Sequence, residues 1–272
     1  MTLRIDRDTR LCMSISARPS NVGTRFHNHL YEELGLNYVY KAFAVTDLAG
    51  AIAGIRALGV RGCAVSMPHK EAVIAFVDEM APSAAVIGAV NTLVNDDGRL
   101  TAHNTDYVAV AKLIVEHGVD PATPLVLRGS GGMAKAVAAA LRDAGFSRGT
   151  VVARNEAAGR ALAERCGWSW SPEVGATAGA LLVNVTPIGM AGGRESEDLA
   201  FDEAAIAVAD TVFDVVAMPS ETPTIRAARR LDRRVITGAE VMTLQAVEQF
   251  VLYTGIRPSD AAIARATAVS RA

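Results

Sequence analysis

Short apolar segments alternate with longer segments in which apolar residues recur every three or four positions. The short segments are typical of buried strands, and the longer ones are typical of helices that bury one face. The Asp96-Asp97-Gly98 turn predicts a hairpin, because Asp-Gly favours a tight turn. Alternating strands and helices predict an α/β fold with a mostly parallel sheet. In the first hundred residues we expect strands at residues 11–16, 38–43, 62–66, 90–94 and 99–101 and helices at residues 24–34, 47–58 and 69–77.

Residues 124–155 are the most informative part of the chain. An apolar run leads into the turn Gly129-Ser130-Gly131-Gly132, and from Met133 the periodicity is helical until Gly145. A second short strand follows at residues 150–152. This order of strand, turn, helix and strand is half of a dinucleotide-binding unit.

Three small residues of this stretch form the pattern G-x-G-x-x-A. Gly129 allows the tight turn, Gly131 lets the backbone approach a pyrophosphate, and Ala134 lets the helix pack closely on the strand. Phosphates would bind the free N–H groups at the helix start, where the helix dipole favours negative charge. Because the flanking segments fit on both sides, we expect a nucleotide site rather than an ordinary strand-to-helix turn.

The end of the second strand indicates which dinucleotide is bound. NAD-binding units place an acidic residue there to hold the ribose 2′-hydroxyl, whereas this chain has Ala153, Arg154 and Asn155. A guanidinium suits a 2′-phosphate, so Arg154 favours NADP (NADPH) over NAD. The alternative is a solvated arginine at a strand end.

The alternation continues to the C-terminus and predicts two domains. We expect an N-terminal α/β domain of residues 1–103 plus 240–272 and a Rossmann-like nucleotide domain of residues 104–239. A long helix at residues 105–117 is the natural hinge, and a C-terminal helix returns to cover the first domain. Further strands are expected at residues 181–185, 211–216 and 234–236, and further helices up to residue 163 and at residues 222–231, 240–253 and 259–268.

Composition narrows the classes of function. Of 272 residues half are hydrophobic, and the net charge is −2 with both signs interspersed, so neither nucleic acid nor a membrane surface is an expected partner. Cys12, Cys63 and Cys166 are widely spaced, and the histidines show no metal-ligand spacing. The charged N-terminus and the lack of a long apolar run indicate a cytoplasmic protein. We expect a small-molecule partner, no metal, and a monomer or homodimer.

Besides the glycine turn, several further strings stand out, namely Ser66-Met67-Pro68-His69-Lys70, Gly88-Ala89-Val90-Asn91-Thr92, Asn104-Thr105-Asp106, Asn184-Val185-Thr186-Pro187-Ile188-Gly189-Met190 and Gln245. Taken together in order and spacing, these strings resemble the shikimate dehydrogenase family over nearly the whole chain. The resemblance implies a two-domain enzyme of the chorismate pathway of aromatic amino acid biosynthesis, with a cleft between an N-terminal substrate-binding domain and the nucleotide domain. Such an enzyme oxidises the 3-hydroxyl of shikimate to 3-dehydroshikimate with NADP as the hydride acceptor.

The resemblance implies that Lys70 and Asp106 form the catalytic pair. Hydride leaves a carbinol carbon only as the hydroxyl proton is removed, so a base must lie within hydrogen-bond reach. A lysine can serve when partial burial favours its neutral form, and an adjacent carboxylate orients it. Without the family strings, Lys70 is a surface lysine at a helix start, and Asp106 is a first-turn carboxylate that the helix dipole favours.

The resemblance also implies two sets of binding residues. Uncharged hydrogen-bonding groups suit a polyol substrate, and Ser66 keeps a hydroxyl where the family has threonine. His27 and Asn28 match an H-N pair that we expect to be structural. The substrate-binding set is Asn21, Ser66, Asn91 and Gln245, and the cofactor-binding set is Gly129, Ser130, Gly131, Gly132, Met133, Arg154, Thr186, Val215 and Gly238.

The chain departs from the family pattern around the substrate. The two serines that bind the shikimate carboxylate fall on Asn21 and Gly23, and the family's tyrosine falls on Ala217. Ala64 and Ala153 each replace an asparagine. Losing a donor to a buried charged group costs about 1.5–3 kcal/mol, so weak activity on shikimate is expected. This pattern resembles the shikimate dehydrogenase-like branch of the family.

Three hypotheses follow from the sequence. The first is an NADP-dependent dehydrogenase of shikimate or a close cyclic hydroxy acid, since Lys70 and Asp106 are both present. The second is a dehydrogenase of quinate or another polyol acid, with NAD as a possible cofactor. The third is a catalytically idle NADP-binding sensor on the same fold, which the altered substrate residues favour slightly.

Overall fold

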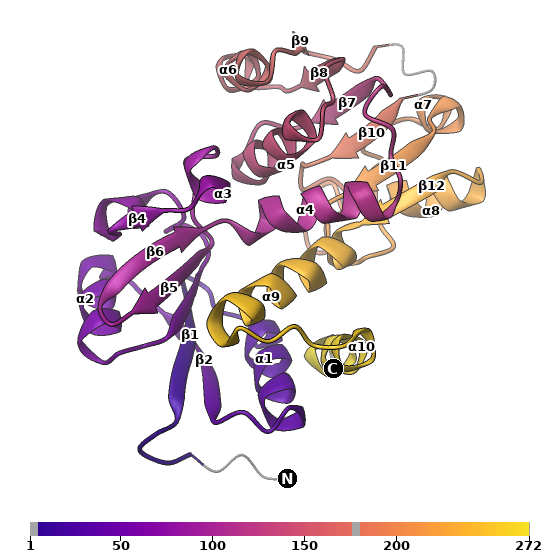
Figure 1. Ribbon diagram of the computed structural model, residues 1–272. Helices are drawn as coiled ribbons and strands as arrows, with labels where there is room; N and C mark the ends of the chain where they lie inside the picture. The colour runs from indigo at the N-terminus through magenta and orange to yellow at the C-terminus, as the bar shows by residue number, and fades with distance from the viewer. Residues whose placement is uncertain (1–4, 176–179, 272) are drawn as a thin grey trace. The chain divides into compact units, whose positions relative to one another are not determined.

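A computed structural model describes residues 5–175 and 180–271 of the chain. The chain divides into two compact units, one formed by Met1–Thr105 and Thr243–Ala272 and the other by Asp106–Met242. Each unit contains one six-stranded sheet with helices packed on it (Figure 1), which confirms the α/β fold class. The two divisions predicted from the sequence lie after residues 103 and 239, and the roles of the two domains stay predictions.

The sheet of the first unit is mixed, with the strand order β2-β1-β3-β5-β6-β4. β1 pairs in parallel with β2 and β3, whereas β5 runs antiparallel to both β3 and β6. At the β5–β6 turn Asp97 and Gly98 have φ values of 50° and 90°, so the Asp-Gly hairpin is confirmed. The strands are β1 (Arg10–Ser16), β2 (Tyr38–Ala44), β3 (Gly62–Val65), β4 (Glu79–Met80), β5 (Thr92–Asp96) and β6 (Arg99–His103).

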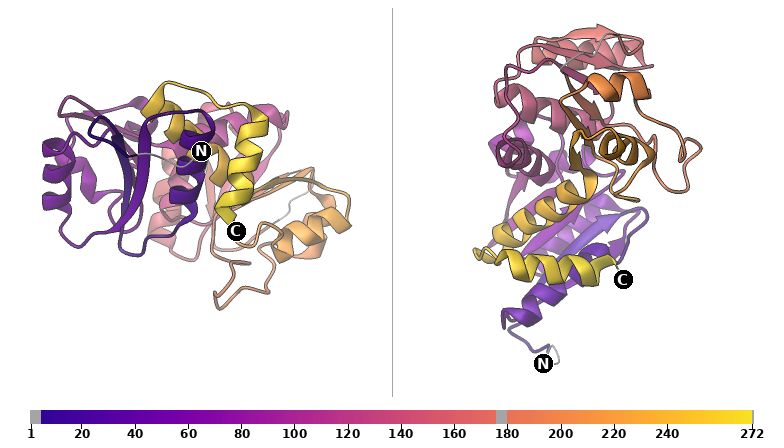
Figure 2. Two further views of the ribbon diagram at one scale, coloured as in Figure 1. Left: turned by 90° about the horizontal axis from the view of Figure 1, so that it is seen from below. Right: turned by 90° about the vertical axis from the view of Figure 1, so that its right-hand side faces the viewer.

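Helices cover both faces of this sheet. α2 (Leu48–Ala57) begins after Asp47, whose carboxylate accepts a 2.9 Å hydrogen bond from the Gly50 N–H and caps the helix. Apolar residues of α2 pack with β1 and β3 in one core. On the other face α1 (Val22–Glu33) packs beside α10 (Asp260–Arg271) and the C-terminal part of α9 (Gly238–Thr254) (Figure 2). The predicted return of a C-terminal helix to the first unit is therefore confirmed.

The helix expected at residues 69–77 is only partly confirmed, and as a 3-10 helix. The chain forms only a 3-10 helix, η1 (Ala72–Phe76), followed later by the short α3 (Pro82–Ala85). The carbonyl of Lys70 accepts a 2.8 Å hydrogen bond from the Val90 N–H. This hydrogen bond between distant parts of the chain occupies a carbonyl that an α-helix would use. A tertiary contact therefore overrides the helical pattern of the local sequence.

His27 and Asn28 are both structural, as expected. The Asn28 side chain donates to the Tyr40 carbonyl (2.9 Å) and accepts from the Tyr40 N–H (2.8 Å), so it occupies the outer edge of β2. The His27 ring is fully buried and stacks on the Tyr40 ring at 4.5 Å between centroids. Desolvation by burial lowers the pKa of His27 to about 3, and the nearby Gln249 side chain acts weakly in the opposite direction.

The second unit contains a fully parallel sheet with the strand order β12-β11-β10-β7-β8-β9. Successive strands β7, β8 and β9 are added in one direction and β10, β11 and β12 in the other. Because such connections are right-handed, the two sets of helices cover opposite faces. The strands are β7 (Leu125–Arg128), β8 (Gly149–Val152), β9 (Ser169–Ser171), β10 (Leu181–Asn184), β11 (Thr211–Asp214) and β12 (Arg234–Thr237).

Within the described residues, five helices belong wholly or largely to this unit. α7 and α8 bury apolar residues against Val126, Leu182 and Val212 of the sheet in one core, and α5 and α6 lie on the other side (Figure 1). β9 and α7 were not expected from the sequence, because both are too short to show a period. The helices are α4 (Thr105–Glu116), α5 (Gly132–Asp143), α6 (Glu156–Cys166), α7 (Glu203–Val208) and α8 (Pro223–Arg230).

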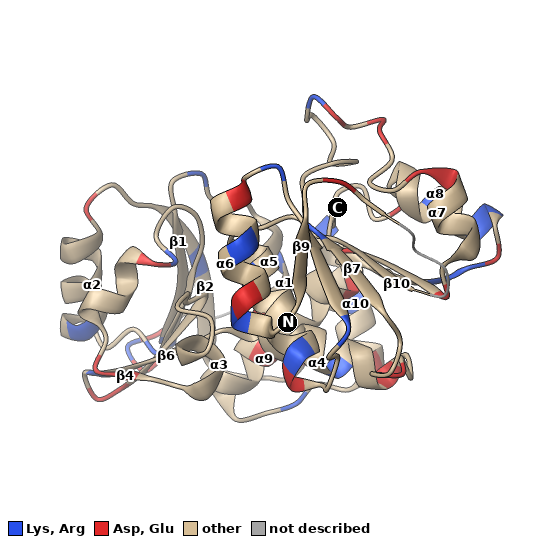
Figure 3. Ribbon diagram, turned by 90° about the horizontal axis from the view of Figure 1, so that it is seen from above, with Lys and Arg blue, Asp and Glu red and all other residues tan. Residues whose placement is uncertain are grey.

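Charged residues are interspersed on the helix surfaces. Along α6 acidic and basic residues alternate (Figure 3), and Arg160 pairs with Glu156 one turn earlier at 2.8 Å. No helix in the described part of the chain is long and apolar enough to cross a membrane.

We predict that His27 makes folding sensitive to acid. As pH falls below 6.5 the unfolded chain binds a proton at this ring, while the folded chain, with a pKa of about 3, does not. The free energy of unfolding should therefore decrease by up to ~1.4 kcal/mol per pH unit until about pH 3. Asp214, whose pKa burial raises to about 6, acts in the opposite direction.

The measurement is urea unfolding of the wild type and of His27→Phe between pH 7.5 and 4.5. The stability difference between the two proteins isolates His27, because Asp214 is common to both. As pH falls, the free energy of unfolding of His27→Phe should increase relative to that of the wild type. A difference that stays constant across this range would contradict the prediction.

Candidate functional site

The turn between β7 and α5 brings the backbone onto the edge of the sheet. Gly129 has a φ of +125°, which favours glycine, and a Cβ at this position would lie 2.9 Å from Val185 Cγ2 and 3.0 Å from the Val185 carbonyl oxygen. A Cβ built on Gly131, in contrast, meets no described atom within 4 Å. The fold therefore requires glycine at position 129, whereas the small residue at position 131 leaves space for a bound group.

The N-terminus of α5 offers backbone donors. Gly131 is the N-cap residue, and no side chain caps the helix there. The first N–H groups of a helix have no partner within the helix. Such groups bind anions readily, and the helix dipole adds to the attraction.

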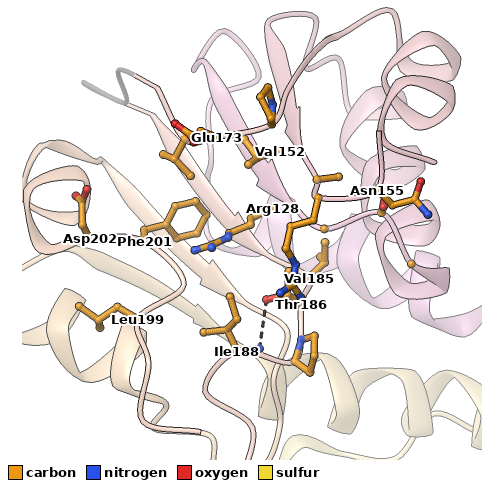
Figure 4. Close-up of a pocket in the computed structure, with 18 residues that line it drawn as sticks. Arg128, Val152, Asn155, Glu173, Val185, Thr186, Ile188, Leu199, Phe201 and Asp202 are labelled. Carbon is orange, nitrogen blue, oxygen red and sulfur yellow. Dashed lines mark hydrogen bonds between the residues drawn. The ribbon is translucent and has the colours of Figure 1, made fainter. Parts of the chain in front are cut away.

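A pocket of about 730 Å³ opens at the carboxyl ends of β7, β8 and β10 (Figure 4). It lies where the strand order reverses between β7 and β10, which is the usual ligand site of an open parallel sheet. The pocket brings five of the nine predicted cofactor residues together, namely Gly129, Ser130, Gly131, Arg154 and Thr186. The other lining residues are Arg128, Val152, Ala153, Asn155, Pro172, Glu173, Val174, Val185, Pro187, Ile188, Leu199, Phe201 and Asp202.

Arg154 projects from the end of β8 into solvent. Its side chain is 82% exposed, and its Nη1 lies 3.8 Å from Glu195 Oε1. Such an exposed, long pair contributes little to stability. Arg154 is thus free to turn toward an anion in the pocket.

Thr186 is held in place by a buried polar network. Its Oγ1 donates to Asn184 Oδ1 at 2.6 Å and accepts from the Ile188 N–H at 3.3 Å (Figure 4). Asn184 in turn donates to Asp214 Oδ1 at 2.9 Å, and Thr222 donates to Asp214 Oδ2 at 2.7 Å. Burial raises the pKa of Asp214 to about 6, despite these bonds. This hydrogen-bond network therefore fixes the loop that follows β10.

Four predicted cofactor residues do not line this pocket. Gly132 and Met133 start α5 just beyond it. Val215 and Gly238 lie against each other, since a Cβ on Gly238 would be 2.3 Å from the Val215 carbonyl oxygen. Close packing of two backbones thus explains the glycine at position 238.

In the first unit, predicted substrate residues gather where β3 and β5 meet. Ser66 follows β3, is exposed, and donates its N–H to the Ile15 carbonyl at 3.0 Å. Asn91 precedes β5, and its N–H donates to the His103 carbonyl at 3.1 Å. Lys70 is tied to this region by the bond between its carbonyl and Val90.

The Asn91 side chain is used within the protein. It is 3% exposed, its Nδ2 donates to Thr105 Oγ1 at 3.0 Å, and its Oδ1 accepts from the Thr105 N–H at 2.8 Å. Thr105 Oγ1 is also 3.4 Å from Gln245 Oε1. Asn91 and Gln245 therefore converge on Thr105, the residue before Asp106. Substrate contacts of these two side chains stay a prediction, and their bonds to Thr105 were not expected from the sequence.

The remaining predicted residues are placed less specifically. Asn21 is exposed at the N-cap of α1 and makes no side-chain capping bond. A Cβ on Gly23 would lie 3.5 Å from the Tyr40 hydroxyl, an ordinary contact, so packing does not require glycine there. Lys70 belongs to the first unit and Asp106 is the first residue of the second, so neither unit alone contains the predicted catalytic pair.

Comparison with known proteins agrees with the fold. A family model described as "Shikimate dehydrogenase substrate binding domain" matches residues 20–93. A shikimate dehydrogenase-like protein of Haemophilus influenzae is 54% identical over 267 residues, which cover 98% of each chain. The chain belongs to the shikimate dehydrogenase family.

Solved structures of family members superpose over nearly the full length. A shikimate 5-dehydrogenase-like protein has a TM-score of 0.97 at 53% identity and covers 99% of this chain and 100% of its own. Shikimate 5-dehydrogenase of Thermus thermophilus, in complex with NADP(H) and shikimate, has a TM-score of 0.84 at 29% identity, with coverage of 96% and 99%. Quinate dehydrogenase of Corynebacterium glutamicum, in complex with NAD, reaches 0.87 at 28%, with coverage of 96% and 98%.

We predict that Gly129→Ala destabilises the protein much more than Gly131→Ala. Alanine at position 129 is strained by its φ and contacts Val185, so it should destabilise the protein by about 2–4 kcal/mol. Alanine at position 131 has space and should cost no more than about 1 kcal/mol. Thermal or urea unfolding of both variants measures this, and equal destabilisation would contradict the assignment of separate roles.

Proposed function

We propose that the protein is an NADP-dependent dehydrogenase of shikimate or a closely related cyclic hydroxy acid. The observation that carries the proposal is the pocket, in which an uncapped helix N-terminus, an unobstructed Gly131 and Arg154 lie together. These groups fit the pyrophosphate and the 2′-phosphate of NADP, respectively. Membership of the family supports the substrate class.

Lys70 and Asp106 are the groups we assign to proton transfer. NADP, when bound, supplies the hydride acceptor. Lys70 takes the proton from the reacting hydroxyl while the hydrogen on the same carbon leaves as hydride, so a carbonyl forms. Asp106 orients the amine and stabilises its protonated form. Asn91 and Gln245 hold Thr105 and so fix the backbone that enters Asp106.

The residues around the substrate distinguish the candidate functions. Asn21 and Gly23 stand where the family has carboxylate-binding serines, and packing does not force either change. Weak turnover of shikimate follows if nothing else binds the carboxylate. Quinate or another polyol acid, with NAD as a possible cofactor, is the second candidate. The altered residues favour a cofactor-binding sensor as the third.

The deciding experiment is an absorbance assay of reduced cofactor with shikimate and quinate, each with NADP and with NAD. We expect saturable turnover on shikimate with NADP and none in Lys70→Ala, because the proton acceptor is lost. NADPH should bind Lys70→Ala as it binds the wild type. Turnover that survives in Lys70→Ala removes Lys70 from the mechanism.

The same assay separates the alternatives. Turnover of quinate that exceeds turnover of shikimate supports the second candidate. NADPH binding without turnover on either acid, or on a panel of related hydroxy acids, supports the sensor. Absence of NADPH binding contradicts every candidate function that uses NADP.

Arg154→Ala tests the cofactor assignment separately. Loss of a charge-assisted bond of about 1.5–3 kcal/mol should weaken NADPH binding by roughly 10- to 100-fold and leave NADH binding nearly unchanged. Fluorescence titration with both nucleotides gives the two affinities. Arg226→Ala, on the exposed side of α8, is a matched control that should change neither. Equal losses for NADPH and NADH in Arg154→Ala would refute the 2′-phosphate contact.

A further inference from the structure

Arg128 is the last residue of β7 and directly precedes Gly129. Residues two apart in a strand share a face, so Arg128 lies on the same side as Val126, which packs with residues of α7 and α8. Its side chain lines the pocket and reaches toward Phe201 (Figure 4). One nitrogen of the guanidinium, Nη1, donates to the Ala200 carbonyl.

Nearby carboxylates balance the positive charge of Arg128 only in part. Burial lowers its pKa, the carboxylate of Glu195 raises it, and Arg154 lowers it again. Arg128 makes no ion pair with a carboxylate in the described part of the chain. Two arginines thus share the field of Glu195, which lies 3.8 Å from Arg154.

Two acidic residues line the pocket, Asp202 and Glu173, and neither balances the charge of Arg128. Asp202 accepts the Ala205 N–H at 2.7 Å and caps α7. Glu173 is exposed, and neither residue contributes to the pKa of Arg128. A guanidinium presents five N–H donors, and the Ala200 carbonyl takes only part of this capacity. Arg128 therefore presents a partly buried cation, held by the Ala200 carbonyl, to a ligand.

We propose that Arg128 is a second guanidinium for a phosphate monoester on the adenosine ribose, acting together with Arg154. The proposal rests on the proposed NADP site and names a specificity-determining residue within it. Arg154 is 82% exposed and must give up solvent and mobility to bind, whereas Arg128 is already held by a backbone carbonyl. A dianionic phosphate is best bound by more than one charge-assisted donor. Glu195 is the counter-ion that the phosphate replaces.

The test measures the affinity of the full chain for NADPH and NADH by titration calorimetry. Arg128→Gln should weaken NADPH by roughly tenfold or more and NADH by less than about twofold, since one charge-assisted contact to the phosphate is lost. Glu195→Gln should tighten NADPH alone, because a like charge beside the phosphate is removed. Arg226→Gln is the matched control and should change neither affinity.

A merely structural Arg128 gives a different result. If it only pins the loop at Ala200, Arg128→Gln lowers the melting temperature and weakens both nucleotides equally, which overturns the proposal. Arg128→Lys keeps the charge and should restore part of the NADPH preference, and no restoration counts against the proposal. Should Arg128→Gln fail to fold, Arg128→Lys and Glu195→Gln still decide through the ratio of the two affinities.

The outcome also separates this inference from the proposed function. A wild type that prefers NADPH, with a preference unchanged in Arg128→Gln, overturns the role of Arg128 and leaves the NADP site intact. A wild type that binds NADPH no better than NADH overturns the 2′-phosphate site itself. In that case the roles proposed for Arg128 and Arg154 are both rejected.

Discussion

The close approach of Gly129 to Val185 is the contact on which the second unit depends. The Val185 N–H donates to the Arg128 carbonyl and the Gly129 N–H to the Val152 carbonyl, so three strand ends are tied at one point. Because no Cβ separates the turn from Val185, the chain enters α5 directly above the sheet edge. The N-terminus of α5 takes its position from this contact.

The parts of the fold that the sequence predicts well have local causes. Asp47 caps α2, Asp97-Gly98 closes a hairpin, and Gly129 requires a backbone that other residues avoid. β9 and α7 could not be predicted in this way, because each is too short to repeat its period clearly. Residues 69–71 read as helical but are held by a bond to Val90, which lies twenty positions further along the chain.

The site shows the same division between local and distant causes. The glycine pattern locates the nucleotide pocket, since the spacing itself encodes the turn. The bonds of Asn91 to Thr105 are invisible in the sequence, because an amide at a strand start can face a ligand or another loop. Arg128 was overlooked for a related reason: the pattern defines where the glycines lie, while the direction of the preceding side chain depends on the packing of α7.

The pairing of Asn28 with Tyr40 bears on how this protein avoids self-association through its sheet edge. An open strand edge invites a strand from a second molecule, and such additions begin many aggregates. The outward N–H and carbonyl of Tyr40, at the middle of β2, are already taken by one amide side chain. At the opposite end of the sheet β4 has only two residues, too few to template another strand. A single asparagine of α1 thus occupies backbone groups at the outer edge of β2 that a second strand would need.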